Sequence, residues 1–332
     1  PGVRAVWHEY RYGAAVMDEA YGAKLPRRRL GRTNLEVPAL GLGGAGIGGV
    51  YGDEPERDAI ETVRYAVEQG ITFIDTDASY GDSERRIGIA LQDGLRRHVV
   101  LSTKCGTHPE RRGDYSWDGT RWNVENSLRV LKTDYIDLLL VHDPPSMEPV
   151  MARRGALEAL EALKEQGVIG FIGLGQRRHD FHRQAIESGR FDVILTYNDY
   201  NPIRTTAADW LLPLAARHGI GVINGSPLAM GLLAGEDPDQ PGQQKRMQPW
   251  QREVKMARRL YHWCEERGIP EPAIVFQFCL RQPLIHCTIT GAKTRAELEE
   301  DLKAATMALP EGIWDEVAAL HLTEGQMQPG EH

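Results

Sequence analysis

Hydrophobic residues recur along the chain at two alternating spacings, one typical of helices and one typical of strands. Residues 55–69 place Ile60 and Val67 on one helical face, with a proline in the first turn and Gly70 after the last residue. Residues 71–75 are a short run of β-branched and aromatic residues ending in an aspartate, which predicts a buried strand. The same succession of helix, glycine and strand continues along most of the chain.

Strands and helices are predicted to alternate from residue 39 to residue 307. The predicted strands span residues 39–44, 71–75, 99–104, 135–141, 168–174, 193–196, 220–223 and 284–290. The predicted helices span residues 55–69, 83–91, 123–131, 153–166, 180–187, 207–217, 250–267, 272–280 and 295–307. Alternation predicts a parallel sheet, and eight units predict an α/β fold of the (β/α)8 TIM barrel type. We expect an N-terminal β-hairpin at residues 28–38 and two extra helices.

An open doubly wound sheet is the alternative fold. It requires a G-x-G-x-x-G turn that enters the first helix, with an acidic residue about 20 positions later. The glycine run at 41–46 is close to that pattern, but the next helix begins only around Pro55. We therefore interpret the run as a barrel loop.

The barrel domain is expected to span residues 26–325, between an N-terminal extension at 1–25 and a C-terminal tail at 326–332. The first 25 residues contain no apolar core of a signal peptide, and no window approaches the roughly 18 apolar residues of a membrane span. We expect a cytoplasmic protein with no membrane partner.

Charge and cysteine content narrow the function classes. The 332-residue chain has a formal net charge of −8, which argues against a nucleic-acid partner, because phosphate binding needs clustered Lys and Arg. The cysteines form no CxxC pair and no zinc-like spacing with His, so free buried thiols are the simplest interpretation. Cys105 keeps a second interpretation as a reactive thiol, because it adjoins a candidate catalytic residue.

Ionisable side chains end three successive predicted strands. Asp75 ends the second strand, Lys104 the third and His142 the fourth, and Tyr80 lies five residues after Asp75. Neighbouring strands of a barrel end side by side at one face. We therefore predict that these four side chains meet and are catalytic.

Proton transfer coupled to hydride transfer is the chemistry that this group suggests. A tyrosine ordinarily has a pKa of about 10, and we expect the Lys104 ammonium to lower the pKa of Tyr80. Asp75 holds the ammonium, and a neutral His142 donates a hydrogen bond to the substrate oxygen. The sequence offers no nucleophile with its own base, which disfavours hydrolysis. Metal binding by the acidic residues around Asp75 ranks lower, because Lys104 would compete with a cation, and no metal is predicted.

These motifs resemble those of the aldo/keto reductase superfamily over roughly residues 28–322. The matching motifs are Phe-Ile-Asp-Thr-Asp-Ala-Ser-Tyr-Gly at 73–81, Leu-Ser-Thr-Lys at 101–104 and Asp-Leu-Leu-Leu-Val-His-Asp-Pro at 137–144. The resemblance implies a TIM barrel closed at its base by a hairpin, and an NAD or NADP cofactor. It also implies a tetrad of Asp75, Tyr80, Lys104 and His142, with Tyr80 as the proton donor.

A narrower resemblance is to the sugar 1-dehydrogenase branch, which includes L-galactose, L-fucose and D-threo-aldose dehydrogenases. It rests on Asp-Tyr-Ser-Trp-Asp-Gly at 114–119, Asn-Ser-Leu at 126–128 and the glycine-containing run at 224–233. That last run would follow the cofactor pyrophosphate, which suits a loop with free backbone amides. The implied cofactor residues are Gly44, Asp75, Gln176, Tyr197, Ser226, Leu228, Gly231, Gly291, Lys293, Glu297, Glu300 and Asp301. The expected substrate contacts are Tyr51, His108, Trp117 and Asn198.

Cofactor preference depends on the segment after the last strand. Glu297 would repel a 2′-phosphate and accept a hydrogen bond from a 2′-hydroxyl, which favours NAD, whereas Lys293 and Arg295 favour NADP. We expect NAD. Gly225 stands where the family often has an aromatic that stacks on the nicotinamide, which is a departure from the family pattern.

The sequence thus predicts an NAD(P)-dependent oxidoreductase that moves a hydride reversibly between nicotinamide C4 and the carbonyl or alcohol carbon of a sugar or small aldehyde. Tyr80 would be its general acid–base. A nucleotide-sensing regulatory subunit with little turnover and a glycoside-processing enzyme that oxidises a sugar transiently stay open. The sequence does not decide between a monomer and a homo-oligomer.

Overall fold

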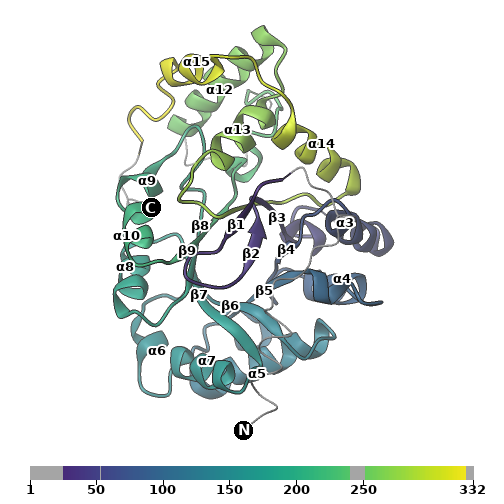
Figure 1. Cartoon of the computed structure of the whole chain (residues 1–332), viewed down its shortest axis with the longest axis vertical. Coiled ribbons are helices and arrows are strands. Elements are labelled where there is room, and N and C mark those ends of the chain that lie inside the picture. The colour runs from purple at the N-terminus through teal and green to yellow at the C-terminus, as the bar shows by residue number, and fades with distance from the viewer. Residues whose placement is uncertain (1–24, 53, 240–250, 327–332) are drawn as a thin grey trace.

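Eight parallel strands form the centre of the computed structural model, which describes residues 25–52, 54–239 and 251–326. They are β3 (Leu40–Gly43), β4 (Phe73–Asp75), β5 (Val100–Cys105), β6 (Ile136–His142), β7 (Ile169–Gly175), β8 (Val193–Tyr197), β9 (Gly221–Gly225) and β10 (Cys287–Thr290). The sheet closes in the order β10-β3-β4-β5-β6-β7-β8-β9 (Figure 1), which confirms the predicted (β/α)8 barrel. Nearly all of the expected N-terminal extension and C-terminal tail lies outside the described residues.

Both faces of the barrel strands are buried, because side chains fill the inside and helices cover the outside. In β6, Leu138 and Leu140 pack into the barrel interior with Phe73, whereas the alternate residues Leu139 and Val141 pack into the surrounding helices. Because successive residues face opposite sides of the strand and both sides are buried, the strand sequences are continuous hydrophobic runs.

A helix follows each strand, and two further helices lie outside that ring. The ring is formed by α3 (Glu56–Glu68), α4 (Ser83–Ala90), α5 (Trp117–Val130), α7 (Ala156–Glu165), α8 (His179–Ser188), α10 (Leu211–Arg217), α13 (Glu271–Leu280) and α14 (Arg295–Thr306). The further helices, α12 (Gln251–Arg267) and α15 (Ile313–Ala319), share one hydrophobic cluster. Two extra helices were expected, but the sequence predicted a range only for the first of them, at 250–267. Short helices lie in the loops: α2 (Gly44–Ile47), α6 (Glu148–Met151), α9 (Thr206–Asp209), and 3₁₀ turns at Leu95–His98, Pro109–Arg111 and Ala229–Gly231.

The structure moves the start of one predicted helix by six residues and divides another, whereas other helix ends differ by a few residues at most. The helix predicted at 123–131 begins at Trp117, because the Ser116 hydroxyl accepts a hydrogen bond from the Gly119 amide at 3.1 Å and caps it there. The helix predicted at 207–217 is divided at Trp210, whose φ of −151° is not helical. Neither change moves a candidate site residue.

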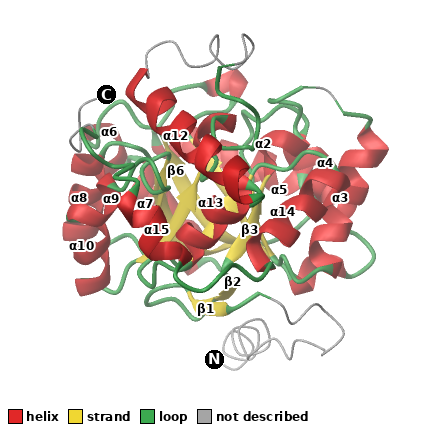
Figure 2. Ribbon diagram, turned by 90° about the horizontal axis from the view of Figure 1, so that it is seen from above, coloured by secondary structure: helices red, strands yellow, loops and turns green. Residues whose placement is uncertain are grey.

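The N-terminal hairpin closes one end of the barrel, opposite the end where α2 follows β3 (Figure 2). Strands β1 (Arg27–Arg29) and β2 (Glu36–Pro38) pair antiparallel. Leu30 and Val37 join the hydrophobic cluster inside the barrel, and Arg28 donates hydrogen bonds to the carbonyl oxygens of Leu280, Gln282 and Ile285. The chemistry is therefore left to the other end of the barrel.

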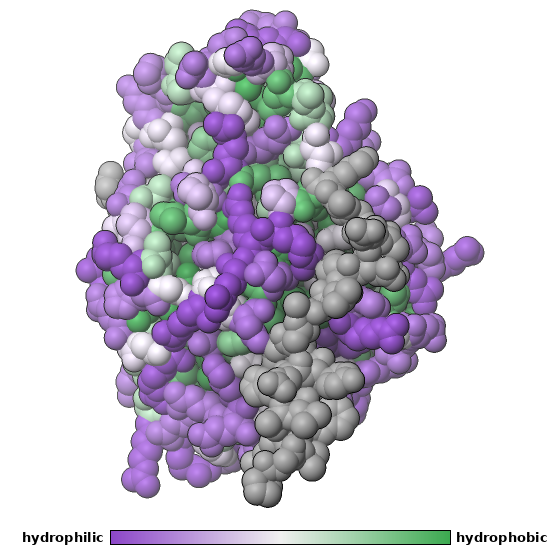
Figure 3. Space-filling view, in the orientation of Figure 1, coloured by the Kyte–Doolittle hydropathy of each residue, from purple (hydrophilic) through white to green (hydrophobic). Residues whose placement is uncertain are grey.

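Hydrophilic residues dominate the outline of the face seen in Figure 3, and hydrophobic residues show in patches nearer its middle. This agrees with helices that turn their apolar faces toward the barrel. Within the described residues, no helix has the length and apolar character needed to cross a membrane.

Candidate active site

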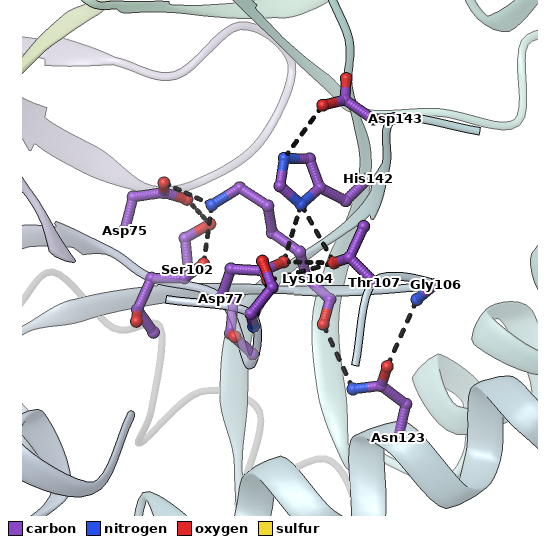
Figure 4. Close-up of polar contacts among 12 residues, drawn as sticks. Asp75, Asp77, Ser102, Lys104, Gly106, Thr107, Asn123, His142 and Asp143 are labelled. Carbon is purple, nitrogen blue, oxygen red and sulfur yellow. Dashed lines mark hydrogen bonds and ion pairs between the residues drawn. The ribbon is translucent and has the colours of Figure 1, made fainter. Parts of the chain in front are cut away.

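Asp75 and Lys104 form a buried ion pair where β4 and β5 end. The Lys104 ammonium donates to Asp75 Oδ2 at 2.6 Å and to the Thr76 carbonyl oxygen at 2.7 Å (Figure 4). Ser102 Oγ donates to the other Asp75 oxygen at 2.8 Å. Burial lowers the pKa of Lys104, but Asp75 and the neighbouring acidic groups outweigh it and raise this pKa above its ordinary value. Lys104 is therefore a fixed cation.

Tyr80 and His142 complete the group that the sequence brought together. Tyr80 lies in the loop between β4 and α4, three residues before the first residue of α4. The Lys104 ammonium lies 4.9 Å from the centre of its ring, and the rings of Tyr80 and His142 meet edge to face with centroids 6.1 Å apart. All four predicted side chains therefore meet at one end of the barrel.

The pKa of Tyr80 differs from the sequence-based expectation. Burial raises the pKa of Tyr80 to about 12, and the opposing effect of the Lys104 ammonium is smaller. The expectation of a lowered pKa omitted this burial, which disfavours the phenolate. Tyr80 is thus a neutral phenol at physiological pH, a form that can donate a proton.

Asp77 is a further buried carboxylate in this group. In the sequence analysis it was only one of the acidic residues weighed as possible metal ligands. Its Oδ2 lies 2.8 Å from His142 Nδ1, and it accepts hydrogen bonds from Thr107 Oγ1 at 2.8 Å and from the Ser79 amide at 2.6 Å (Figure 4). Burial alone would raise the pKa of Asp77, but the hydrogen bond and charge of His142 outweigh it and hold this pKa well below its usual range. The spacing Asp-Thr-Asp, which puts both carboxylates on one side of an extended chain, was the signal available in the sequence.

The other acidic residues near Asp75 point to separate partners. Asp82 is paired with Arg85 at 3.1 Å, and Glu84 accepts a hydrogen bond from Thr103 at 2.7 Å. Among the described residues, no group of three His, Cys, Asp or Glu side chains is arranged to hold a metal ion. Cys105 is fully buried, and burial raises the pKa of its thiol to about 12, which favours an inert structural thiol.

A cavity of about 580 Å³ opens beside His142. It is lined by Ser79, Gly106, Thr107, Pro109, Arg112, Gly113, Tyr115, His142, Asp143 and Pro145. Tyr115 donates a hydrogen bond to the His142 carbonyl oxygen at 2.6 Å, and Asp143 Oδ2 lies 3.5 Å from His142 Nε2. The cavity thus brings His142 of the predicted tetrad together with hydroxyl, carboxylate and guanidinium groups.

None of the four expected substrate residues is among those that line the cavity. Tyr51 is 49% exposed and lies beside Gly291. His108 binds the Glu110 amide and Asn126 through its two ring nitrogens. The Trp117 ring has the guanidinium groups of Arg121 and Arg154 over it, 6.0 and 5.5 Å from its centre. Asn198 has a left-handed φ of 60°, and its amide donates to the Gly225 carbonyl oxygen.

The loop after β9 has an unusual backbone. Ser226, Ala229 and Met230 have φ angles of 53°, 49° and 59°, which L-residues rarely adopt. Leu228 accepts hydrogen bonds from the amides of Gly231 and Leu233 and holds the turn. Such strained turns occur at ligand sites, and alternating right- and left-handed residues aim backbone amides at an anion.

Gln176 and Tyr197, the expected nicotinamide contacts, lie at the ends of β7 and β8. The Gln176 side chain accepts from the amides of Arg177 and Arg178 and donates to the Pro144 carbonyl oxygen at 3.2 Å. The Tyr197 hydroxyl donates to Asp143 at 3.2 Å. Both side chains are held by the loops around the mouth.

The segment after β10, which includes the first turns of α14, contains the residues expected to contact the adenosine. Glu297 accepts from the Lys293 amide at 2.9 Å, and the Lys293 side chain pairs with Glu54 at 2.8 Å. The Thr290 hydroxyl donates a hydrogen bond to Asp301. Burial raises the pKa of Asp301 to about 6, and the negative charges of Glu297 and Glu300 add to this effect. Glu300 is exposed.

The barrel, with an Asp–Lys ion pair, a tyrosine and a histidine at neighbouring strand ends, defines the class of TIM-barrel enzymes whose chemistry lies at the carboxyl ends of the strands. The model of the aldo/keto reductase family matches residues 39–321, and the chain belongs to this family. It is therefore an oxidoreductase that acts on aldehyde or alcohol groups.

Two curated relatives and one solved structure are similar along nearly their whole length. L-galactose dehydrogenase of Arabidopsis thaliana is 34% identical over 294 residues, which cover 85% of this chain and 89% of the relative. D-threo-aldose 1-dehydrogenase of a Pseudomonas species is 30% identical over 317 residues, or 87% and 95% of the two chains. An aldo-keto reductase of Bacillus halodurans, in its holo form, shares the fold with a TM-score of 0.74 at 24% identity, covering 89% of this chain and 96% of that one.

Proposed function

We propose that this protein is an NAD-dependent dehydrogenase of hydroxylated aldehydes, with a sugar lactol as its alcohol substrate. Tyr80 is the general acid–base, Lys104 and Asp75 set its electrostatic environment, and His142 binds the substrate oxygen. The observation that carries the proposal is the buried phenol of Tyr80, which lies beside a fixed ammonium and edge to face with His142, a residue that lines the cavity.

The residues at the barrel mouth fit a nicotinamide dinucleotide. The left-handed turn at Ser226–Gly231 suits the pyrophosphate, since a turn of this kind can aim amides at an anion. The Ala229 and Gly231 amides are not among them, because they donate to the Ser226 and Leu228 carbonyl oxygens. Asp301, a half-buried carboxyl group that accepts a hydrogen bond from Thr290, is suited to accept a further one from an amino group of the adenine. When bound, this cofactor supplies or takes the hydride.

NAD is the proposed form because the cations near α14 already have partners. Lys293 pairs with Glu54 at 2.8 Å, and Arg295 pairs with Glu299 at 2.8 Å. A 2′-phosphate would have to compete with those carboxylates, and Glu297 adds a third negative charge nearby. A 2′-hydroxyl carries no such requirement.

A sugar is the proposed substrate for two reasons. The cavity offers hydroxyl, carboxylate and guanidinium groups from Thr107, Tyr115, Asp143 and Arg112, which match a molecule with several hydroxyl groups. The similar relatives are named for the oxidation of L-galactose and of D-threo-aldoses.

A spectrophotometric screen tests the cofactor and the substrate class together. Purified protein is incubated with NAD or NADP and a panel of aldoses, pyridoxal-like aldehydes and simple ketones, and nicotinamide absorbance is followed in both directions. We expect NAD-linked oxidation of one or more aldoses. Nucleotide binding without turnover across the whole panel would favour a regulatory subunit, and product formation without net NAD reduction would favour a glycoside-processing enzyme.

Replacement of the phenol tests the role of Tyr80. In Tyr80→Phe we expect kcat to fall by about 10²–10⁴-fold, the usual contribution of general acid–base catalysis, with cofactor affinity unchanged. Steady-state kinetics and a cofactor titration by protein fluorescence measure the two quantities. Turnover at the wild-type rate in Tyr80→Phe would rule out this mechanism.

A further inference from the structure

His142 lies between two carboxylates, one at each ring nitrogen (Figure 4). Asp77 Oδ2 is 2.8 Å from Nδ1, and Asp143 Oδ2 is 3.5 Å from Nε2. The two acids differ in environment, because Asp77 is fully buried while the Asp143 side chain is 38% exposed and lines the cavity. The inner nitrogen therefore has a fixed partner, and the outer nitrogen faces the space where substrate is proposed to bind.

The hydrogen bonds of Asp77 determine which ring nitrogen carries a proton. The Ser79 amide donates to Oδ1 at 2.6 Å, and the Thr107 hydroxyl donates to both oxygens at 3.1 and 2.8 Å. The pKa of Asp77 is held well below its usual range, so this carboxylate only accepts hydrogen bonds. At 2.8 Å from it, Nδ1 must be the donor. The Thr107 oxygen, 3.1 Å from Nδ1, shares the same proton.

This arrangement changes the hydrogen bonding available at Nε2. A neutral imidazole has one N–H, and here Nδ1 holds it, so Nε2 is an acceptor. Only a protonated His142 can donate from Nε2. The sequence-based expectation, a neutral His142 that donates to the substrate oxygen, requires the opposite tautomer.

The charged and titratable groups that surround His142 come from five segments. They are Asp77 and Tyr80 from the loop after β4, Lys104 from β5, Arg112 and Tyr115 from the loop after β5, Asp143 after β6, and Tyr197 of β8 through Asp143. Within the part of the chain that the structure describes, only Asp77 and Asp143 lie within 4 Å of a ring nitrogen as charged partners. Asp77 is the one with the geometry of a hydrogen bond.

We propose that Asp77 is a positioning residue that reserves the Nδ1 proton of His142, so that Nε2 is the atom that exchanges a proton with the substrate side of the pocket. Neutral Nε2 accepts the hydrogen bond of an alcohol, and protonated Nε2 donates to a carbonyl oxygen. This inference rests on the oxidoreductase function proposed above, although the tautomer itself does not depend on the substrate.

The proton and electron balance is simple. In oxidation the alcohol O–H bond breaks, its proton passes to the Tyr80 oxygen, and the Tyr80 phenolic proton passes to Nε2. A nicotinamide held by the residues at the barrel mouth would take the electron pair of the C–H bond as hydride. In reduction the same proton returns to the carbonyl oxygen. Tyr80 is a neutral phenol before and after both directions, in agreement with its pKa of about 12.

Nuclear magnetic resonance of the ring nitrogens tests the tautomer without any turnover. The full chain is labelled with ¹⁵N-histidine, and long-range ¹H–¹⁵N spectra are recorded over a pH titration, with His142→Gln identifying the His142 signals. We expect the neutral ring of wild-type His142 to carry its proton on Nδ1, with Nε2 unprotonated. A neutral wild-type His142 with its proton on Nε2 would overturn the proposal, and this measurement needs no variant of Asp77.

Asp77→Asn tests the link to catalysis, since it keeps the shape but offers only one oxygen acceptor to three donors. We expect the neutral tautomer to shift toward Nε2–H and kcat to fall by about 10²–10⁴-fold, as when a histidine loses the carboxylate that fixes its tautomer. At constant pH the loss applies to both reaction directions, because a variant leaves the reaction equilibrium unchanged. Cofactor affinity should stay at the wild-type value.

Glu84→Gln is the matched control, because Glu84 is also a buried carboxylate that accepts from a threonine, Thr103, at 2.7 Å. It should leave the His142 signals as in the wild type. Asp77→Asn with an unchanged tautomer and an unchanged kcat would refute the positioning role. Absence of activity on every aldose with Nδ1 still protonated would reject the proposed function and leave the tautomer assignment intact.

Discussion

Glu271, the first residue of α13, is a carboxyl group buried away from the catalytic group. It is 3% exposed and accepts a hydrogen bond from the Gly235 amide at 3.0 Å, and its other oxygen has no partner among the described residues. Burial raises the pKa of Glu271 from 4.5 to about 8, and the Gly235 hydrogen bond lowers it only in part. In the fold this side chain is therefore protonated at neutral pH.

Titration of Glu271 predicts a pH-dependent stability. Its folded pKa is above its unfolded pKa, so its contribution to stability is complete below pH 4.5 and is lost as pH rises through about 8. Glu271→Gln stays neutral and removes this loss. We expect the free energy of unfolding of the variant, relative to wild type, to rise by up to roughly 4 kcal/mol between pH 5 and pH 9. Urea unfolding at several pH values measures it.

Glu266→Gln on the surface of α12 is the control, since Glu266 is 76% exposed. It should show no such trend with pH. A constant difference between Glu271→Gln and wild type from pH 5 to pH 9 would mean that Glu271 is ionised in the fold.

Two loops at the barrel mouth are joined across the closure of the sheet. Glu54 lies in the loop between β3 and α3, and Lys293 lies in the loop between β10 and α14. Strands β3 and β10 pair with each other where the chain closes the barrel. Their side chains meet at 2.8 Å, and the Glu54 hydrogen bond raises the pKa of Lys293. The ion pair thus connects the first and last units of the barrel beside the proposed adenosine site.

Breaking this link should change the cofactor preference. Glu54→Gln frees the Lys293 ammonium for a 2′-phosphate, so we expect NADP to bind about two- to fivefold more tightly, the scale of a partly exposed ion pair, with NAD affinity nearly constant. Fluorescence titration with both cofactors measures the ratio. Glu61→Gln, which breaks the Glu61–Arg64 pair on α3, is the control. An NADP to NAD affinity ratio that is equal in Glu54→Gln and wild type would contradict the proposed basis of NAD preference.

At the scale of the whole molecule, the backbone of the hairpin turn packs directly on the backbone at the start of β9, at the end of the barrel that the hairpin closes. Gly31 has a φ of 56°, and a Cβ there would lie 2.2 Å from the Gly221 amide nitrogen at the start of β9. The next residue, Arg32, donates its amide to the Gly219 carbonyl oxygen at 2.6 Å. The turn of the hairpin therefore allows only glycine at position 31.

Gly31→Ala should destabilise the whole barrel. Left-handed backbone costs an L-residue about 1–2 kcal/mol, and the contact with β9 adds to this because backbone cannot move aside as a side chain can. We expect a loss of at least about 2 kcal/mol in the free energy of unfolding, measured by urea denaturation. Gly167→Ala isolates the contact, since Gly167 has a similar φ of 75° and open space around it. Equal losses of unfolding free energy in the two variants would show that the close contact between Gly31 and β9 contributes nothing to the cost of the substitution.

The sequence by itself determined the architecture, because hydrophobic periodicity reports which faces must be buried in any fold of this chain. Eight strand–helix units imply a closed barrel, and barrel closure makes neighbouring strand ends converge. Asp75, Lys104 and His142 could therefore be placed together from their positions at successive strand ends, with Tyr80 carried along by its short loop.

Only the tertiary structure decided the charge states and the partners of those side chains. The raised pKa of Tyr80 depends on how completely the surrounding loops exclude water, and the contact between Asp77 and His142 joins residues 65 positions apart. The cavity beside His142 is built from loops, whose paths follow no repeating pattern of hydrophobic residues. For that reason the strand ends could be predicted from local patterns, whereas the pocket wall and the proton positions required the folded chain.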